Sequence, residues 1–88
     1  MPCFNEEPTI REIVNKVLHA ETLGMQLELI VVDDGSEDQS VEIIKTLASA
    51  DNRVKLITKA NNSGKGAALR EGIRHAGGDI VLIQDADL

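Results

Sequence analysis

The sequence predicts an α/β fold in which a parallel β-sheet is flanked by helices. Short apolar segments rich in β-branched residues alternate with longer segments whose apolar residues recur at helical spacing. The connections between them are short and rich in Gly, Asn, Asp and Ser, which favour turns. This alternation is typical of successive βαβ units, so we expect the strands to be parallel.

Three segments have the pattern of amphipathic helices: about 9–23, 38–50 and 65–76. In the first, Thr9 and Glu12 match a capping box, and Gly24 is a plausible stop. Ser36 or Asp38 could cap the second helix.

Three segments are predicted to be strands: 27–32, 54–58 and 79–83. The first is almost continuously apolar, which predicts burial on both faces. Residues 1–4 are predicted to be turn material, where a doubly wound fold would have a strand. We therefore expect one truncated domain over residues 1–88 that lacks its first strand and its C-terminal half.

The composition excludes several classes of function. The formal net charge is −6, which argues against binding a nucleic-acid backbone. Cys3 is the only cysteine, so an internal disulfide is impossible, and a lone thiol suits a reducing cytosol. Phe4 is the only aromatic residue, so Ile, Leu, Val and Ala must build the core. We find neither a signal-peptide pattern nor an apolar run of the ~20 residues that span a bilayer.

Two pairs of acids follow predicted strands: Asp33 with Asp34, and Asp85 with Asp87. Ligands of parallel sheets bind outside the carboxyl ends of the strands. In an extended Asp-x-Asp segment both carboxylates face one point, where Mg²⁺ or Mn²⁺ could bind; the alternative is a solvated acidic loop. The first pair could accept hydrogen bonds from a base or ribose, although a helix N-cap would explain one of these acids.

Residues 63–66 form the only Gly-Lys cluster, at the start of a predicted helix. Its amides and Lys65 could face a phosphate, but a flexible turn with a solvated lysine explains it equally well. The cluster matches neither a Walker A loop nor G-x-G-x-x-G. His19 and His75 are expected on helix surfaces, and Arg70 and Arg74 on a solvated helix face.

Taken together, four segments resemble family 2 glycosyltransferases of the GT-A fold, and most of all the polyprenyl-phosphate (dolichol-phosphate) mannosyl- and glucosyltransferases. The resemblance is carried by residues 2–7, 31–36, 62–68 and 78–88, in that order. It implies a Rossmann-like, nucleotide-sugar-binding half of a GT-A fold and an inverting transfer of a hexose. The implied nucleotide-sugar contacts are Pro2, Phe4, Glu6, Asp33, Asp34 and Lys65, and the implied catalytic, metal-binding acids are Asp85 and Asp87.

The resemblance also implies partners. The donor would be a nucleotide-diphosphate sugar, the cofactor Mg²⁺ or Mn²⁺, and the acceptor a lipid phosphate or a glycan. The parent protein would act in the cytoplasm or at the cytoplasmic face of a membrane. We expect residues 1–88 alone to be inactive, and their exposed strand edges to favour self-association.

Two other classes of protein are weighed against this one. A dinucleotide-binding Rossmann domain requires a glycine-rich first turn, and residues 5–8 carry Asn-Glu-Glu-Pro instead. A non-enzymatic nucleotide- or metal-binding α/β module, such as a receiver-like domain, would use Asp33 and Asp34 but leave Asp85 and Asp87 without a role.

Overall fold

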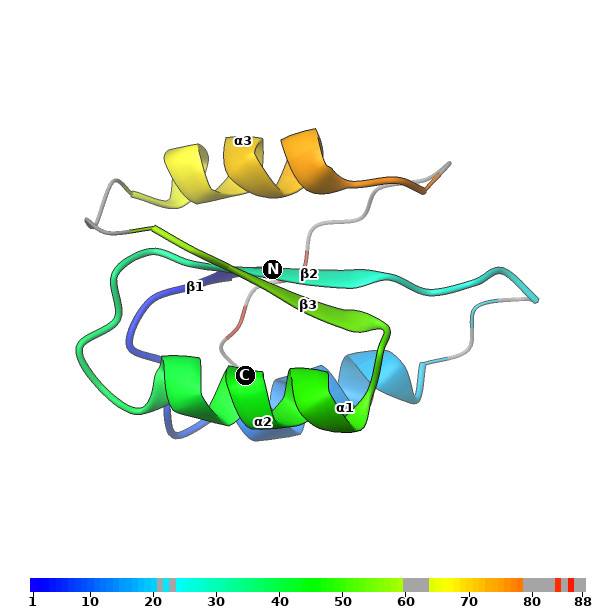
Figure 1. Ribbon diagram of the computed structural model, residues 1–88, viewed down its shortest axis with the longest axis horizontal. Helices are drawn as coiled ribbons and strands as arrows, with labels where there is room; N and C mark the ends of the chain where they lie inside the picture. Colours follow the sequence, from blue (N-terminus) through cyan, green and yellow to red (C-terminus); the bar gives the residue numbers. More distant parts are fainter. Residues whose placement is uncertain (21, 23, 60–63, 79–83, 85, 87–88) are drawn as a thin grey trace.

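A computed structural model describes residues 1–20, 22, 24–59, 64–78, 84 and 86. It confirms the α/β prediction, with strands and helices alternating along the chain (Figure 1). The strand predicted at 79–83 lies outside the described residues. The elements are β1 (Pro2–Cys3), α1 (Ile10–Leu18), β2 (Leu29–Asp33), α2 (Ser40–Ala50), β3 (Val54–Thr58) and α3 (Lys65–His75).

The described strands form a parallel sheet in the order β1-β2-β3. Helix α3 covers one face of the sheet, and α1 and α2 lie together on the other (Figure 1). In the register, Cys3 pairs with Asp33, and Asp33 pairs with Thr58. The three strands therefore end in one row, from which the loops of the carboxyl edge leave the sheet.

Strand β2 builds the core on both faces of the sheet, as its almost continuous apolar run predicts. All five of its residues are buried. Leu29 and Val31 pack towards α1 and α2, whereas Ile30 and Val32 pack towards α3, because successive side chains of a strand point to opposite faces. The larger cluster contains Cys3, Ile10, Ile13, Val14, Leu29, Val31, Ile44, Leu47, Val54 and Ala86, and the smaller one Ile30, Val32 and Ala68.

Helix α3 lies close to β2 because of a glycine at the contact. A Cβ atom added at Gly72 would lie 3.3 Å from Cγ2 of Val32, which is tighter than ordinary van der Waals contact. The residue thus allows the helix backbone to approach the central strand.

The turn predicted for residues 1–4 is wrong. Pro2 and Cys3 form β1, which pairs with Val32 and Asp33 of β2. A two-residue strand has no periodicity of its own, so only its pairing with β2 identifies it.

Helix α1 is shorter than predicted and ends at Leu18 instead of near residue 23. Its inward apolar positions stop there, because the next ones are Glu21 and Thr22. The carbonyl oxygen of Asn15 lies 2.7 Å from Nδ1 of the His19 ring. The same oxygen accepts the backbone N–H of His19 at 3.1 Å. Gly24 does not end the helix, and it adopts a φ of 83° in the connection that follows.

The predicted helix caps are only partly correct. Thr9 is the residue before α1, but its side chain caps no helical N–H, so the capping box with Glu12 is wrong. Helix α2 begins at Ser40 after Gln39, not at residue 38. Asp38 still serves this end of the helix, since its Oδ1 accepts the backbone N–H of Ser40 at 2.9 Å.

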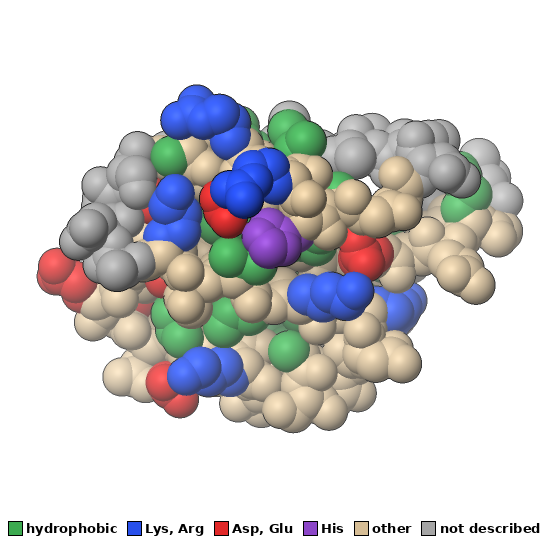
Figure 2. Space-filling model, turned by 45° about the horizontal axis from the view of Figure 1, so that its top comes forward, with side chains coloured by type: hydrophobic (Ala, Val, Ile, Leu, Met, Phe, Trp, Pro, Cys, Tyr) green, Lys and Arg blue, Asp and Glu red, His purple; other side chains and the backbone are tan. Residues whose placement is uncertain are grey.

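Lys and Arg side chains are visible on the face that Figure 2 turns forward, and several have an acid beside them. Arg74 lies 3.1 Å from Glu71, and Lys55 lies 2.9 Å from Glu28. Both pairs are exposed, so they contribute little to stability. Within the described ranges, none of the helices combines the length and apolar character needed to cross a bilayer.

Candidate active site at the carboxyl edge of the sheet

Asp33 and Asp34 lie at the carboxyl end of β2, where the sequence predicted a ligand site. Both are buried, with 2% and 3% of their surface exposed. Their side chains diverge. Asp33 bonds to Ser36 on the side of α1 and α2, whereas Oδ2 of Asp34 accepts the backbone N–H of Gly64, just before α3, at 2.7 Å. Asp34 therefore connects β2 to the loop that precedes Lys65.

The carboxylate of Asp33 organises the turn after β2. Its Oδ2 accepts the backbone N–H of Ser36 at 2.9 Å, and its Oδ1 accepts the hydroxyl of the same serine. Its own backbone carbonyl accepts the N–H of Lys59 at 2.8 Å. Asp33 is thus fixed by the turn and by the end of the neighbouring strand.

The β1–α1 loop is bonded directly to this turn through Asn5. The backbone N–H of Asn5 donates to Oγ of Ser36 at 2.9 Å, and Oδ1 of Asn5 accepts the N–H of Glu37 at 2.7 Å. Asn5 has a φ of 52°, in the left-handed region that Asn tolerates better than most residues.

Further bonds join the same two loops. The N–H of Glu6 donates to Oγ of Ser40 at 2.9 Å, and the N–H of Gln39 donates to Oε1 of Glu7 at 2.8 Å. The N–H of Glu7 donates to Oδ2 of Asp38 at 3.1 Å. Burial raises the pKa of Asp38, but hydrogen bonds from Ser40 and from the N–H of Glu7 outweigh this and lower the pKa overall. The two loops therefore form one interlocked unit.

A third segment reaches this unit from the far end of the chain. The hydroxyl of Thr9 donates to the backbone carbonyl of Ala86 at 3.0 Å, across 77 residues of sequence. Ala86 is buried and belongs to the same core cluster as Cys3 and Ile10. Asp85 and Asp87 lie outside the described residues, but the residue between them is held beside the start of α1.

The other predicted contact residues lie around the same edge. Phe4 is 38% exposed and Glu6 is half-buried, both in the loop after β1. Pro2 is half-buried within β1. Lys65 is the first residue of α3, next to Gly64. The backbone thus brings Pro2, Phe4, Glu6, Asp33 and Asp34 to one edge, with Lys65 beginning the adjacent helix.

Cys3 is the last residue of β1 and is buried at this edge. Burial raises the pKa of its thiol to about 11, and the charge of Asp33 contributes in the same direction. A thiol that keeps its proton at neutral pH is a poor nucleophile, and Cys3 packs in the larger core cluster.

The donor set predicted for a metal consists of carboxylate oxygens, which hard divalent cations prefer. Across the described residues, no group of three or more His, Cys, Asp and Glu side chains could hold a metal ion. His75 is exposed on α3, as predicted, and its ring lies 3.3 Å from Glu71. His19 is also exposed, but it is the residue after α1 and not part of the helix. Asp85 and Asp87, which the resemblance implies for a metal, precede and follow Ala86 in the sequence and lie outside the described residues.

The whole of the chain, residues 1–88, matches the model of the family described as glycosyl transferase family 2. The chain belongs to glycosyltransferase family 2. This agrees with the α/β fold and its parallel sheet.

Similar proteins have the same printed name, undecaprenyl-phosphate 4-deoxy-4-formamido-L-arabinose transferase. They include proteins of Edwardsiella ictaluri, Salmonella paratyphi B and Salmonella newport. Each is 36% identical to this chain over 90 residues, which cover 100% of this chain and 28% of the relative. The family 2 chain therefore spans less than a third of the length of the curated relatives that it matches.

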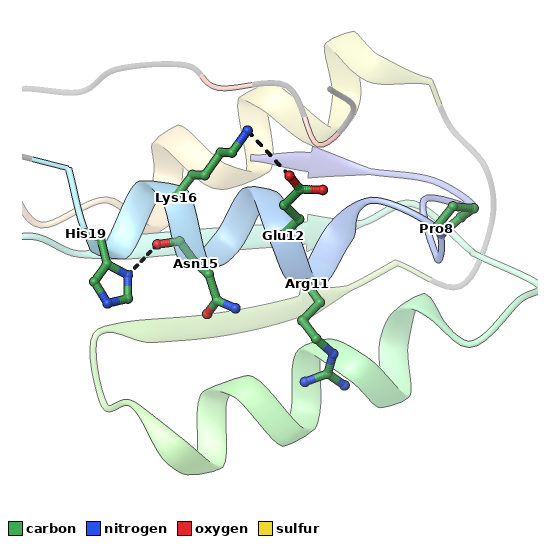
Figure 3. Close-up of a pocket in the computed structure, with 6 residues that line it drawn as sticks. All are labelled: Pro8, Arg11, Glu12, Asn15, Lys16 and His19. Atoms are coloured by element: carbon green, nitrogen blue, oxygen red, sulfur yellow. Dashed lines mark hydrogen bonds and ion pairs between the residues drawn. The ribbon is translucent and has the colours of Figure 1, made fainter.

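The surface of this family 2 chain also has a concave region that involves α1. It is a shallow surface hollow along the solvent-facing side of α1 (Figure 3). It holds none of the predicted site residues, and its polar groups partly bond to one another, as in the 3.5 Å ion pair between Lys16 and Glu12. It is lined by Pro8, Arg11, Glu12, Asn15, Lys16 and His19.

Several residues that organise the loops at the carboxyl edge had no assigned role in the predicted site: Asn5, Ser40 and Thr9, together with the bond from Ser36 to Asp33. The spacing of Asp33 and Ser36 is that of a side chain that caps a turn, and it could have revealed the bond between them. No local signal predicts the bonds of Asn5, Ser40 or Thr9, because their partners lie 31 to 77 residues away.

Proposed function

We propose that the protein to which this chain belongs transfers a hexose from a nucleotide-diphosphate sugar, of the GDP-mannose or UDP-glucose type, to a polyprenyl phosphate. The transfer inverts the anomeric carbon. One observation carries the proposal: the loops after β1 and β2 are interlocked at the carboxyl edge, and Thr9 connects them to Ala86, between the two remaining acids. Segments far apart in sequence thus form one site where ligands of parallel sheets bind.

The nucleoside binds between the two interlocked loops. Phe4 is the only aromatic residue of the chain, and its partly exposed ring offers a base a surface for stacking. Pro2 and Glu6 are half-buried at the same edge, and Asp33 and Asp34 are buried there at the end of β2. Lys65 opens α3, where the N–H groups of a helix start and an ammonium group both favour a phosphate.

Asp85 and Asp87 hold a Mg²⁺ or Mn²⁺ ion, because carboxylate oxygens suit such ions. When bound, the ion neutralises the charge that develops on the leaving nucleoside diphosphate. The contribution of the described residues is to fix the backbone between these acids, through the bond from Thr9 to Ala86. A fixed backbone reduces the reorganisation needed when the donor binds.

The acceptor is inferred from the relatives. Their names include undecaprenyl phosphate and a modified arabinose, and we take the lipid phosphate as the acceptor. A phosphate acceptor is already anionic, so its oxygen can attack the anomeric carbon without a general base. A lipid acceptor also brings the protein to the cytoplasmic face of a membrane.

Binding measurements on the purified protein test this proposal against its alternatives. By calorimetry with GDP, UDP and NAD, with and without Mn²⁺, we expect Mn²⁺-dependent binding of GDP or UDP. Asp85→Asn and Asp87→Asn should abolish the dependence on Mn²⁺. Glu42→Gln, on the exposed side of α2, is the matched control and should bind like the unmodified protein.

Two results would contradict the proposal. Binding of NAD without metal would indicate a dinucleotide-binding domain. Binding of Mn²⁺ without any nucleotide affinity would indicate a receiver-like module. If nucleotide binding is found, a transfer assay with GDP-mannose or UDP-glucose and undecaprenyl phosphate identifies the sugar and the acceptor.

A further inference from the structure

The two adjacent acids of the site have different surroundings. Asp33 points to the side of α1 and α2, where it is buried beside Cys3 and bonded to Ser36. Asp34 points to the side of α3 and accepts a bond from Gly64. The side chains of adjacent residues in a strand point to opposite faces of the sheet. The carboxylates of Asp33 and Asp34 therefore cannot both face the same atom of a ligand.

Both oxygens of Asp33 are engaged by a single residue. Ser36 donates its N–H to Oδ2 at 2.9 Å and its hydroxyl to Oδ1. With 2% of its surface exposed, Asp33 presents little area to any ligand. Because the carboxylate is buried and each oxygen already accepts a bond within the turn, a ligand has little access to it.

The hydroxyl of Ser36 continues this chain of bonds into the other loop. While it donates to Asp33, it also accepts the N–H of Asn5 at 2.9 Å. The side chain of Asn5 makes a second bond between the two loops, because its Oδ1 accepts the N–H of Glu37 at 2.7 Å. A continuous path of hydrogen bonds therefore runs from the carboxylate of Asp33, through Ser36, to the backbone beside Phe4.

We propose that Asp33, Ser36 and Asn5 form a positioning unit, which sets the distance between the two loops of the nucleotide site. Asp33 acts through Ser36 and does not touch the base. This assignment rests on the proposed function, since it requires that the carboxyl edge bind a nucleoside diphosphate. It replaces the direct contact that the family resemblance implies for Asp33.

A positioning unit and a direct contact respond differently to mutation. A residue that bonds to the base distinguishes GDP from UDP, so its loss changes the ratio of the two affinities. A residue that fixes the loops affects both nucleotides by the same factor. The affinity ratio therefore distinguishes a base contact from a positioning residue. The affinities and the melting temperature together distinguish a positioning residue from one that only stabilises the fold.

The experiment measures the dissociation constants of GDP and UDP by calorimetry with Mn²⁺, and the melting temperature of each variant. Ser36→Ala removes the bridging hydroxyl, and we expect it to weaken both nucleotides equally, by about tenfold. Ser36→Thr keeps the hydroxyl and should restore affinity to within about twofold of the unmodified protein. Ser49→Ala, on the exposed side of α2, is the matched control and should change neither constant.

Two further variants test the ends of the unit. Asn5→Gly still permits the left-handed backbone but removes the acceptor for Glu37, so it should weaken both nucleotides by the same factor. Asp33→Asn should also leave the ratio of GDP to UDP affinity unchanged.

Each other outcome overturns a specific claim. A change in the GDP to UDP ratio in Asp33→Asn would make Asp33 a direct contact. A lower melting temperature in Ser36→Ala with unchanged affinities would reduce the unit to a structural role. If the unmodified protein binds neither nucleotide, the proposed function fails and this assignment fails with it; if it binds and Ser36→Ala binds equally well, only the assignment fails.

Discussion

The buried thiol of Cys3 predicts how the stability of the protein depends on alkaline pH. Its pKa is raised from 9.0 to about 11, first by burial and then by the charge of Asp33. The unfolded chain thus loses this proton at a lower pH than the folded protein does. The resulting contribution is fully present below about pH 9 and is lost as the pH rises through about 11. Between about pH 8 and about pH 11 the free energy of unfolding should fall by roughly 2 kcal/mol from this group alone.

Urea denaturation at a series of pH values measures this effect, with Cys3→Ala as the comparison. The substitution removes the titrating thiol, and its packing cost is the same at every pH. The sequence contains no Tyr, so lysines dominate the remaining titration in this range, and both proteins share them. The unmodified protein should lose about 2 kcal/mol more than the variant. Parallel curves for the two proteins would refute the raised pKa, as would rapid labelling of Cys3 by a thiol reagent at about pH 8.

The remaining predictions concern packing and the connection to Ala86. Ile44 is fully buried, so Ile44→Ala should lower the free energy of unfolding by about 2–5 kcal/mol in urea titrations. The control is Ile73→Ala, at an exposed position, which should change this free energy by under about 0.5 kcal/mol. Similar losses in the two variants would contradict the core assignment. Thr9→Val keeps the shape of the side chain but removes the bond to Ala86, so it should cost about 1 kcal/mol. Thr9→Ser should retain most of that stability, and equal losses in both Thr9 variants would exclude the bond as the cause.

Sequence patterns predicted the elements whose signals are local. Strand β3 has the predicted bounds, because an apolar run with β-branched residues follows a turn at residues 51–53. The end of α1 was misplaced because Gly24 indicated a later stop, although the inward apolar positions end at Leu18. Strand β1 could not be predicted, since its identity depends on partners 30 residues away.

The same distinction applies to the site. Asp33 and Asp34 were placed at the carboxyl edge from the order of strand and loop alone. Their different directions follow from alternation along β2, but their partners could not be inferred from it. The bond from Asn5 to Ser36 requires two loops to meet in space, and a single sequence carries no signal for that contact.

The common row formed by Cys3, Asp33 and Thr58 constrains how this chain can tolerate insertions and deletions. One residue gained or lost within β2 would reverse the facing of every side chain that follows, and would turn Asp33 away from Ser36. The connection between α1 and β2 leaves from the opposite edge of the sheet, so changes in its length leave the row intact. Length variation among related chains should therefore concentrate between residues 19 and 28, and should be absent from residues 29 to 33.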